Sequence, residues 1–322
     1  MLKKLQAFFN PEYFQGWHKK KRYFEGWYYK IVDPTEKYAF AVIPGITMDQ
    51  NGEKHAFIQV LDGKKLVSCY HTFDFDEFTA DHGKLHITIQ NNVFTEKGLQ
   101  IKLPELQGKL TFHNTVPWPK PFYAPGIMGP YAFVPFMECY HGIVSMDHAI
   151  KGNLKYHNEQ ISFDQGRGYI EKDWGRSFPG AYFWLQSNHF GQPEISIKAS
   201  VAKIPWLNNH FTGFICGVWI KDRLIRFTTY NNTVLKKSFA DEQNVELMMQ
   251  NNTYQLSISA QRDHATSLAS PVQGLMEGRI EESMNAKLKV HLIDLKNDRI
   301  LLQDTGRNAG LEVAGDIEKL FV

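Results

Sequence analysis

Short runs of alternating apolar and polar residues dominate the chain and predict β-strands. The runs are rich in β-branched and aromatic residues, and Gly, Asn or Asp bounds most of them. The predicted strands are Tyr38–Ile43, His55–Val60, Leu85–Ile89, Glu194–Val201, Phe211–Ile220, Arg223–Tyr230, Tyr254–Ala260 and Lys287–Leu295. Turn pairs at hairpin spacing separate them, at Asn51-Gly52, Asp62-Gly63 and Asn231-Asn232. A helical pattern is confined to the first dozen residues and a short piece after Asp316. The pattern predicts an all-β protein with antiparallel sheets, as barrels or sandwiches.

One proline-rich segment interrupts the strand pattern. Residues 115–135 contain prolines at 117, 119, 121, 125, 130 and 135, each of which lacks a donor for a β-ladder. The segment also carries many aromatic residues, which a flexible linker would lack. We interpret it as a packed loop or lid over a barrel mouth, the alternative being an ordinary ordered crossing loop. A boundary between two halves is expected between residues 150 and 168, which gives predicted domains of 1–160 and 161–322.

Composition and charge narrow the class of protein. Apolar residues make up 43% of the 322 residues and charged residues 22%, as in ordinary soluble globular proteins. With a net charge of only +2, the protein as a whole does not attract nucleic acid, so no nucleic-acid partner is expected. The basic run His18–Arg22 either forms a solvated turn or is weakly attracted to an anionic membrane surface. No apolar stretch approaches the roughly 18 residues of a membrane span. We therefore expect a cytoplasmic protein, with peripheral membrane contact as an option.

Known metal, nucleotide and nucleophile motifs are absent from the sequence. The phosphate-binding loop G-x-x-x-x-G-K-[ST], the nucleophile elbow G-x-S-x-G and the zinc helix H-E-x-x-H do not occur. Cys69, Cys139 and Cys216 are far apart, so reduced thiols are expected. His82 and His86 share a strand face, but no third ligand accompanies them. The sequence therefore predicts neither a metal nor a cofactor.

The strongest candidate for chemistry is the run from Gly168 to Pro179. In strand alternation Glu171 and Asp173 share one face, and Lys172 lies on the other. A poorly hydrated carboxyl beside the indole of Trp174 has a raised pKa and can act as a general acid. The alternative is a solvated loop with mutual ion pairs.

Further candidates surround this run in sequence. Glu25, Trp27 and Tyr28 repeat the theme of an acid beside aromatic rings. Trp184, Gln186 and Asn188 alternate as a strand lining a cavity would. The tryptophans either pack in a core or stabilise a carbocation through the ring quadrupole. His141 and Asp147 are candidates for a proton relay at the cavity mouth, the alternative being structural hydrogen bonds.

These blocks resemble the tocopherol cyclase family. The resemblance rests on Phe24-Glu25-Gly26-Trp27-Tyr28-Tyr29, Glu171-Lys172-Asp173-Trp174-Gly175-Arg176-Ser177-Phe178-Pro179, Trp184-Leu185-Gln186-Ser187-Asn188 and Gly310-Leu311-Glu312-Val313-Ala314-Gly315. It implies two lipocalin-like β-barrel or sandwich halves. It also implies an activity without metal or redox change, in which a prenylated quinol is protonated on a side-chain double bond and its phenol oxygen closes a ring.

The resemblance suggests roles for the candidate residues. Asp173 or Glu171 would deliver the proton, and His141 or Asp147 would accept the hydroxyl proton. Gln186 and Asn188 would orient the ring oxygens, while Trp27, Tyr28, Trp174 and Trp184 would shelter the cation. The substrate would be a hydrophobic small molecule or lipid. The alternatives are an acid-catalysed hydratase or isomerase of a terpenoid, and a lipid-binding protein without catalysis.

Overall fold

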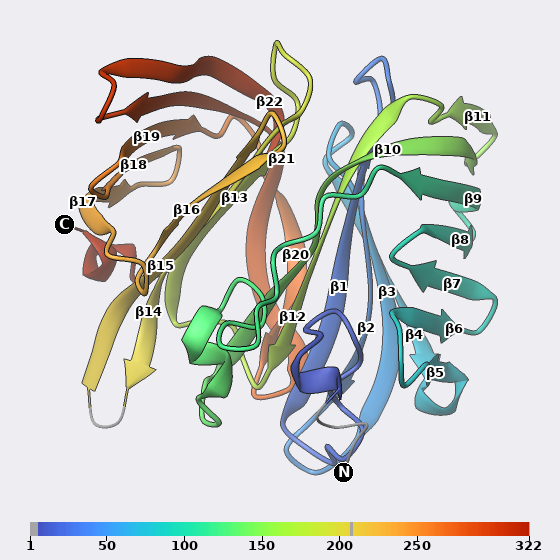
Figure 1. Cartoon of the computed structure of the whole chain (residues 1–322). Coiled ribbons are helices and arrows are strands. Elements are labelled where there is room, and N and C mark those ends of the chain that lie inside the picture. Colours follow the sequence, from blue (N-terminus) through green and yellow to red (C-terminus); the bar gives the residue numbers. More distant parts are fainter. Residues whose placement is uncertain (1–5, 207–208, 322) are drawn as a thin grey trace. The chain divides into compact units, whose positions relative to one another are not determined.

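The computed structural model describes residues 6–206 and 209–321, and within them the chain is almost entirely β-structure (Figure 1). The described strands form a 12-stranded and a 10-stranded sheet with antiparallel pairing, as between β1 and β12 or between β13 and β14. The all-β prediction with two antiparallel halves is therefore confirmed. Among the described residues, no helix is long and apolar enough to cross a membrane.

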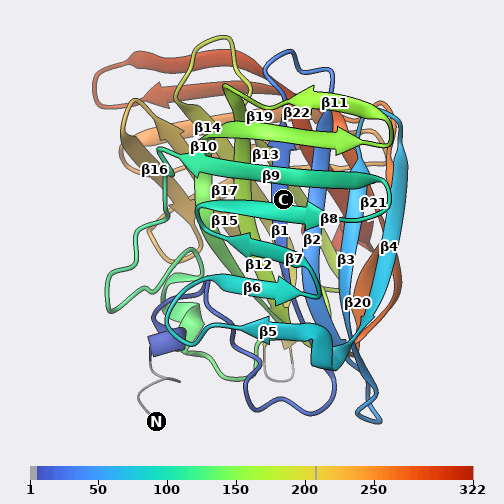
Figure 2. The same ribbon diagram turned by 90° about the vertical axis from the view of Figure 1, so that its right-hand side faces the viewer.

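The first sheet has the order β4-β3-β2-β1-β12-β10-β9-β8-β7-β6-β5, and β11 pairs with β10. Figure 2 shows β5 to β9 stacked as a meander that runs across the direction of β1 to β4. The bounds are β1 Tyr23–Val32, β2 Ala39–Met48, β3 Lys54–Asp62, β4 Val67–Asp74, β5 Phe78–Ala80, β6 His86–Ile89, β7 Asn92–Thr95, β8 Gly98–Lys102, β9 Leu106–His113, β10 Cys139–Tyr156, β11 Glu159–Ser162 and β12 Gly166–Gly175.

The second sheet has the order β16-β15-β14-β13-β22-β21-β19-β18-β17, and β20 pairs with β21. The bounds are β13 Ala181–Ser187, β14 Ile195–Trp206, β15 Asn209–Ile220, β16 Arg223–Thr228, β17 Val234–Ala240, β18 Asn244–Gln250, β19 Tyr254–Gln261, β20 Thr266–Val272, β21 Leu275–Asp294 and β22 Arg299–Gly315. The short 3-10 helices are η1 Phe75–Glu77, η2 Gly129–Phe133 and η3 Ile317–Leu320. The hairpin prediction at Asn231-Asn232 is wrong, because β16 and β17 are opposite ends of this sheet order.

The chain divides into two compact units. Unit 1 contains the described residues up to Phe178 together with Ala269–Arg279, and unit 2 contains Pro179–Leu268 and the described residues from Ile280. Unit 1 extends past the predicted boundary at residue 160 because β12 pairs with both β1 and β10. Residues 269–279 join unit 1 through hydrogen bonds, for example from the Ala269 amide to Gln59 Oε1 at 2.9 Å.

Each unit has its own apolar core. Along β1 of unit 1, the alternate residues Trp27, Tyr29 and Ile31 enter the core, as the period of two requires. The core of unit 2 includes Phe183 and Leu185 of β13. In both sheets the positions between these core residues therefore lie on the opposite face.

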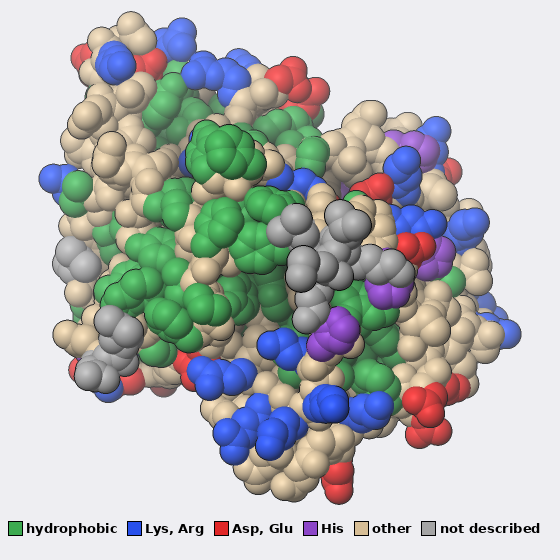
Figure 3. All heavy atoms as spheres, turned by 60° about the horizontal axis from the view of Figure 1, so that its bottom comes forward, with side chains coloured by type: hydrophobic (Ala, Val, Ile, Leu, Met, Phe, Trp, Pro, Cys, Tyr) green, Lys and Arg blue, Asp and Glu red, His purple; other side chains and the backbone are tan. Residues whose placement is uncertain are grey.

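Residues 114–138 form the proline-rich connection between β9 and β10 and contain η2. The buried side chains of Trp118 and Ile127 anchor the connection. It therefore packs as an ordered loop, and Figure 3 looks onto the end of the molecule at which it lies.

Candidate functional site

The candidate acids lie on the central strand of unit 1, β12, between β1 and β10. Glu171 is opposite Tyr28 on β1, and Asp173 is opposite His141 on β10. Directly opposed residues in antiparallel strands project from the same face of the sheet. The prediction that Glu171 and Asp173 share a face is confirmed, and strand pairing adds His141 and Tyr28 to that face.

His141 lies between the two acids. Its Nδ1 is 2.8 Å from Asp173 Oδ1, and its Nε2 is 3.4 Å from Glu171 Oε2. The exposed fractions of the side chains are 11% for His141, 6% for Glu171 and 25% for Asp173. One imidazole that contacts two carboxylates through different nitrogens can take a proton on one side and release one on the other.

Tyr169 completes this cluster, which we call the acid–histidine cluster (Tyr169, Glu171, Asp173 and His141). The Tyr169 hydroxyl donates a hydrogen bond to Glu171 Oε2. Burial raises the pKa of Tyr169 well above its usual value, and the negative charge of Glu171 raises it further. The hydroxyl therefore stays protonated and serves as a fixed donor to Glu171.

His141, Glu171 and Asp173 also offer three ligand atoms within 4.8 Å of one another, as a divalent cation would need. The sequence did not single out these three as metal ligands. Each imidazole nitrogen already contacts a carboxylate, and a cation bound at one nitrogen would replace that contact. The same geometry also allows proton transfer between the imidazole and either carboxyl group. His82, which was considered as a metal ligand with His86, stacks on Trp17 with ring centroids 3.6 Å apart.

Glu25, Trp27 and Trp174 lie on the opposite face of the same strands, toward the core of unit 1. There Lys172 Nζ is 2.6 Å from Glu25 Oε1, and both side chains are fully buried. The Lys172 ammonium also lies 4.9 Å from the Trp27 ring centre and 4.5 Å from that of Trp174. The sheet separates Glu25, Trp27 and Trp174 from the acid–histidine cluster. The Lys172 ammonium already occupies a face of each tryptophan ring.

The Glu25–Lys172 pair is tied to the N-terminal segment. Lys172 Nζ donates to the Pro11 carbonyl at 2.8 Å, and the Gln15 amide donates to Glu25 at 2.8 Å. The Trp27 indole donates to the Glu12 carbonyl at 3.0 Å. Burial lowers the pKa of Lys172, while the charge of Glu25 opposes that shift. The contacts describe a structural network that holds residues 11–15 against β1 and β12.

The structure does not bring Asp147 to the acid–histidine cluster. Its carboxylate is held by Arg167, with Nε to Oδ1 at 3.0 Å and a second contact from Nη2. Asp147 is six positions along β10 from His141, or roughly 20 Å at the usual rise per residue. Its observed partner is a guanidinium, which makes it an ion-pair residue of unit 1.

His148, next to Asp147, is buried and neutral. Burial lowers its pKa to about 3, with a smaller contribution from the Arg167 charge. Ser145 Oγ donates to the Asp147 carbonyl at 2.8 Å and lies 3.1 Å from His148 Nδ1, so Nδ1–H can donate to Ser145. Between about pH 3 and 6.5 the imidazole of His148 is therefore neutral in the folded protein, whereas it is protonated in the unfolded chain.

This gives a prediction for stability against pH. Above the unfolded pKa of about 6.5 both states are neutral at His148, and below it only the unfolded chain gains the proton. Stability should therefore fall with acidification between about pH 6.5 and 3, by up to about 1.4 kcal/mol per pH unit from this residue. Urea unfolding at several pH values should show a shallower fall for His148→Asn, whose amide can still donate to Ser145. Equal slopes for both proteins would contradict it.

Trp184, Gln186 and Asn188 belong to unit 2, on and just after β13. Trp184 and Gln186 alternate with the core residues Phe183 and Leu185, so they lie on the face away from the unit 2 core. All three are buried. A Cβ atom at Gly310 would lie 2.5 Å from the Trp184 ring, so only glycine at position 310 leaves room for that ring. Their role as ligand contacts stays a prediction.

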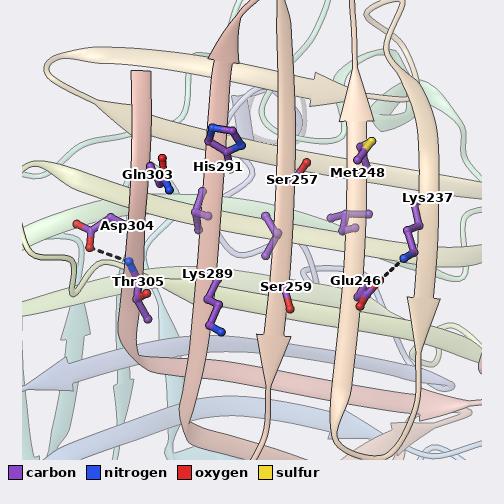
Figure 4. Close-up of a pocket in the computed structure, with 13 residues that line it drawn as sticks. Lys237, Glu246, Met248, Ser257, Ser259, Lys289, His291, Gln303, Asp304 and Thr305 are labelled. Carbon is purple, nitrogen blue, oxygen red and sulfur yellow. Dashed lines mark hydrogen bonds and ion pairs between the residues drawn. The ribbon is translucent and has the colours of Figure 1, made fainter. Parts of the chain in front are cut away.

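A separate hollow of about 670 Å³ lies on unit 2 (Figure 4). Polar side chains from five strands line it, among them Lys237, Glu246, Ser257, Lys289 and His291. None of the candidate residues lines it. Residues of unit 2 alone line the hollow, whereas the acid–histidine cluster belongs to unit 1.

Sequence reasoning missed Tyr169 and the partner of Lys172. Tyr169 is two positions before Glu171, so strand alternation alone would have placed it on the same face. The burial of Lys172 beside Glu25 depends on the pairing of β1 with β12, which joins segments about 150 residues apart in the chain. No local signal carries that information.

Comparisons with known proteins point to one family. A family model described as tocopherol cyclase-like matches residues 21–315. A probable chloroplastic tocopherol cyclase of Oryza sativa subsp. japonica is 24% identical over 195 residues, and a chloroplastic tocopherol cyclase of Zea mays is 23% identical over 194. Each match covers 57% of this chain and 41% of the relative, so the aligned region spans less than half of either plant protein.

Solved structures share the fold at low sequence identity. A putative AttH from Nitrosomonas europaea superposes with a TM-score of 0.56 at 12% identity, covering 91% of this chain and 93% of that one. CghA, solved with Sch210972, gives 0.56 at 9% identity, covering 91% and 89%. Kievitone hydratase from Nectria haematococca gives 0.52 at 11% identity, covering 92% and 90%. These similarities support the two-sheet architecture.

Proposed function

Because the chain belongs to the tocopherol cyclase-like family, we propose that it is an enzyme that closes a ring on a prenylated quinol or related isoprenoid lipid by proton transfer. The observation that carries the proposal is the position of His141 between the carboxylates of Glu171 and Asp173, on the sheet face away from the unit 1 core. Such a cluster can give one proton and take another in a single turnover.

In the proposed reaction Glu171 gives its proton to a side-chain double bond of the substrate. The resulting tertiary cation is attacked by the phenol oxygen, a C–O bond forms, and the phenol proton passes to His141. The imidazole then returns a proton to Glu171, which is 3.4 Å away, so that the product is an isomer of the substrate. The protein exchanges only protons with the substrate, and no redox partner is needed.

The other residues of the cluster support this division of roles. We assign the donor role to Glu171 because it is the less exposed acid. The Tyr169 hydroxyl fixes the position of its side chain. Asp173 orients His141 through Nδ1. Tyr28, opposite Glu171, is the aromatic candidate on the correct face to stabilise the cation. We give Trp27 and Trp174 no such role, because both rings lie beside the Lys172 ammonium.

The test is incubation of the purified protein with a prenylated methylhydroquinone under anaerobic conditions, followed by liquid chromatography and mass spectrometry. Ring closure gives a product of unchanged mass with one fewer free hydroxyl group. A product heavier by one water would identify a hydratase and contradict ring closure. Tight binding of unaltered substrate would identify a lipid-binding protein and contradict catalysis.

A further inference from the structure

The loop 114–138 presents several large aromatic side chains to solvent. Phe122, Tyr123, Phe133 and Phe136 are 79%, 63%, 46% and 48% exposed. The loop is nevertheless anchored, because Trp118 is only 1% exposed. Ordered exposure of several aromatic rings within one loop is unusual for a surface that faces only water.

The loop itself has little charge, and a basic run lies on the segment before β1. From Asn114 to Met137 the sequence contains no acidic residue and one basic residue, Lys120. The side chains of the basic run Lys19, Lys20, Lys21 and Arg22 are all exposed, and no acidic residue occurs from Gly16 to Phe24. Lys120 is paired with Glu12, so the basic charge of this surface comes from the run Lys19–Arg22. The combination of exposed aromatic rings and exposed basic residues is typical of surfaces that bind anionic lipid headgroups.

The two segments lie at the same end of unit 1. The N-terminal segment that leads into the basic run contacts the loop directly, because the rings of Phe8 and Phe133 are 5.2 Å apart. Lys120 Nζ also lies 3.1 Å from Asn10 Oδ1. Figure 1 shows the loop and the start of β1 at this end.

We propose that this end of unit 1 docks on the surface of an anionic lipid bilayer. The docking face comprises Phe122, Tyr123, Phe133, Phe136 and the run Lys19–Arg22. The aromatic rings enter the headgroup region, where amphipathic and aromatic side chains are favoured. The basic side chains bind the lipid phosphates, and together the two kinds of contact give a stronger attachment than either alone.

The docking face is connected to the acid–histidine cluster. The loop ends in β10, where the Tyr140 hydroxyl donates to the Val134 carbonyl at 2.6 Å, and His141 is the next residue. If the proposed function holds, the face would bring the cluster close to the membrane that contains a prenylated substrate. The docking itself does not depend on catalysis and is measured without substrate.

Flotation of the protein with lipid vesicles tests the proposal. Vesicles of phosphatidylcholine with about 30% phosphatidylglycerol should carry the protein, and phosphatidylcholine alone should carry much less. Phe122→Ser should weaken the binding at least about tenfold, since a phenylalanine that leaves water gains about 1.4 kcal/mol or more. Lys20→Gln with Lys21→Gln should weaken it about 30-fold at low salt, at about 1 kcal/mol per basic residue near the surface.

Ile300→Ser is the matched control, because Ile300 is 54% exposed on β22 of unit 2 and lies outside the docking face. It should bind vesicles like the wild type. Equal loss in this control and in Phe122→Ser, or no flotation of the wild type with anionic vesicles, would overturn the proposal. A wild-type dimer that Phe122→Ser converts to a monomer, without vesicle binding by either, would assign the face to self-association and also overturn it. Circular dichroism verifies that each variant is folded.

Discussion

Replacement of Glu171 by Gln should lower kcat for ring closure by about 10²–10⁴-fold, with little change in KM. The amide keeps the shape of the carboxyl and can still accept the hydrogen bond from Tyr169. It cannot deliver a proton to a double bond, and the loss of a general acid typically costs a rate factor of this size. Single-turnover rates with excess enzyme, followed by mass spectrometry, would measure the chemical step directly.

The neighbouring acid should behave differently. Asp173→Asn keeps a group beside His141 Nδ1 but removes its negative charge, so the imidazolium loses stabilisation. It should lower kcat with little change in KM, and Asp173→Glu, which keeps a carboxylate, should recover part of the loss. Recovery by the carboxylate variant reports a positioning role that a merely structural change would not produce.

Glu246→Gln is the matched control for both variants. Glu246 is a half-exposed acid in the polar hollow of unit 2, and its replacement should leave kcat unchanged. Wild-type turnover by Glu171→Gln would remove Glu171 as the proton donor. An equal loss in Glu246→Gln would move the search for the site to the hollow of Figure 4.

The part of the site that could be predicted from sequence depends on local periodicity. Glu171 and Asp173 are two positions apart in a strand, so their common face follows from the geometry of any strand. The same rule places Lys172 on the other face, as the register with Trp27 confirms. The two-sheet fold also follows from local signals, since short alternating runs bounded by turn residues cannot form long helices.

The part that could not be predicted depends on pairing between distant strands. His141 was a candidate, but its contact with Asp173 requires the register of β10 against β12, which includes two irregularities. Glu25, Trp27 and Trp174 have the composition of an active site, an acid beside aromatic rings. An acid beside aromatic rings can equally surround a buried cation. Only the position of Lys172 in the structure distinguishes such a cation site from an active site. The proline-rich segment indicated an ordered loop but not which of its rings are exposed.

Lys172→Met should lower the free energy of unfolding by about 3–5 kcal/mol, the usual cost of leaving one member of a buried ion pair without its partner. Glu25 would remain fully buried beside an apolar side chain, and the carbonyls of Pro11 and Tyr13 would lose their donor. Urea unfolding would measure the change. The surface pair Lys237–Glu246 provides the matched comparison, since both side chains are about half exposed. Lys237→Met should cost less than about 1 kcal/mol.

The double variant Glu25→Gln with Lys172→Met separates the charge from the packing. If most of the loss in Lys172→Met comes from the isolated carboxylate, removing that charge should restore more than half of the lost stability. A double variant whose loss equals the sum of the single losses would mean that the two side chains do not interact energetically. The Gln15 amide and the Tyr23 hydroxyl, which donate to Glu25, would still find an acceptor in the side-chain carbonyl that the substitution leaves at this position. Recovery would therefore show that the cost of Lys172→Met comes from the unpaired buried carboxylate of Glu25 and not from lost packing. Glu25 and Lys172 lie on the opposite side of the sheet from the acid–histidine cluster, so activity per folded molecule should be largely retained.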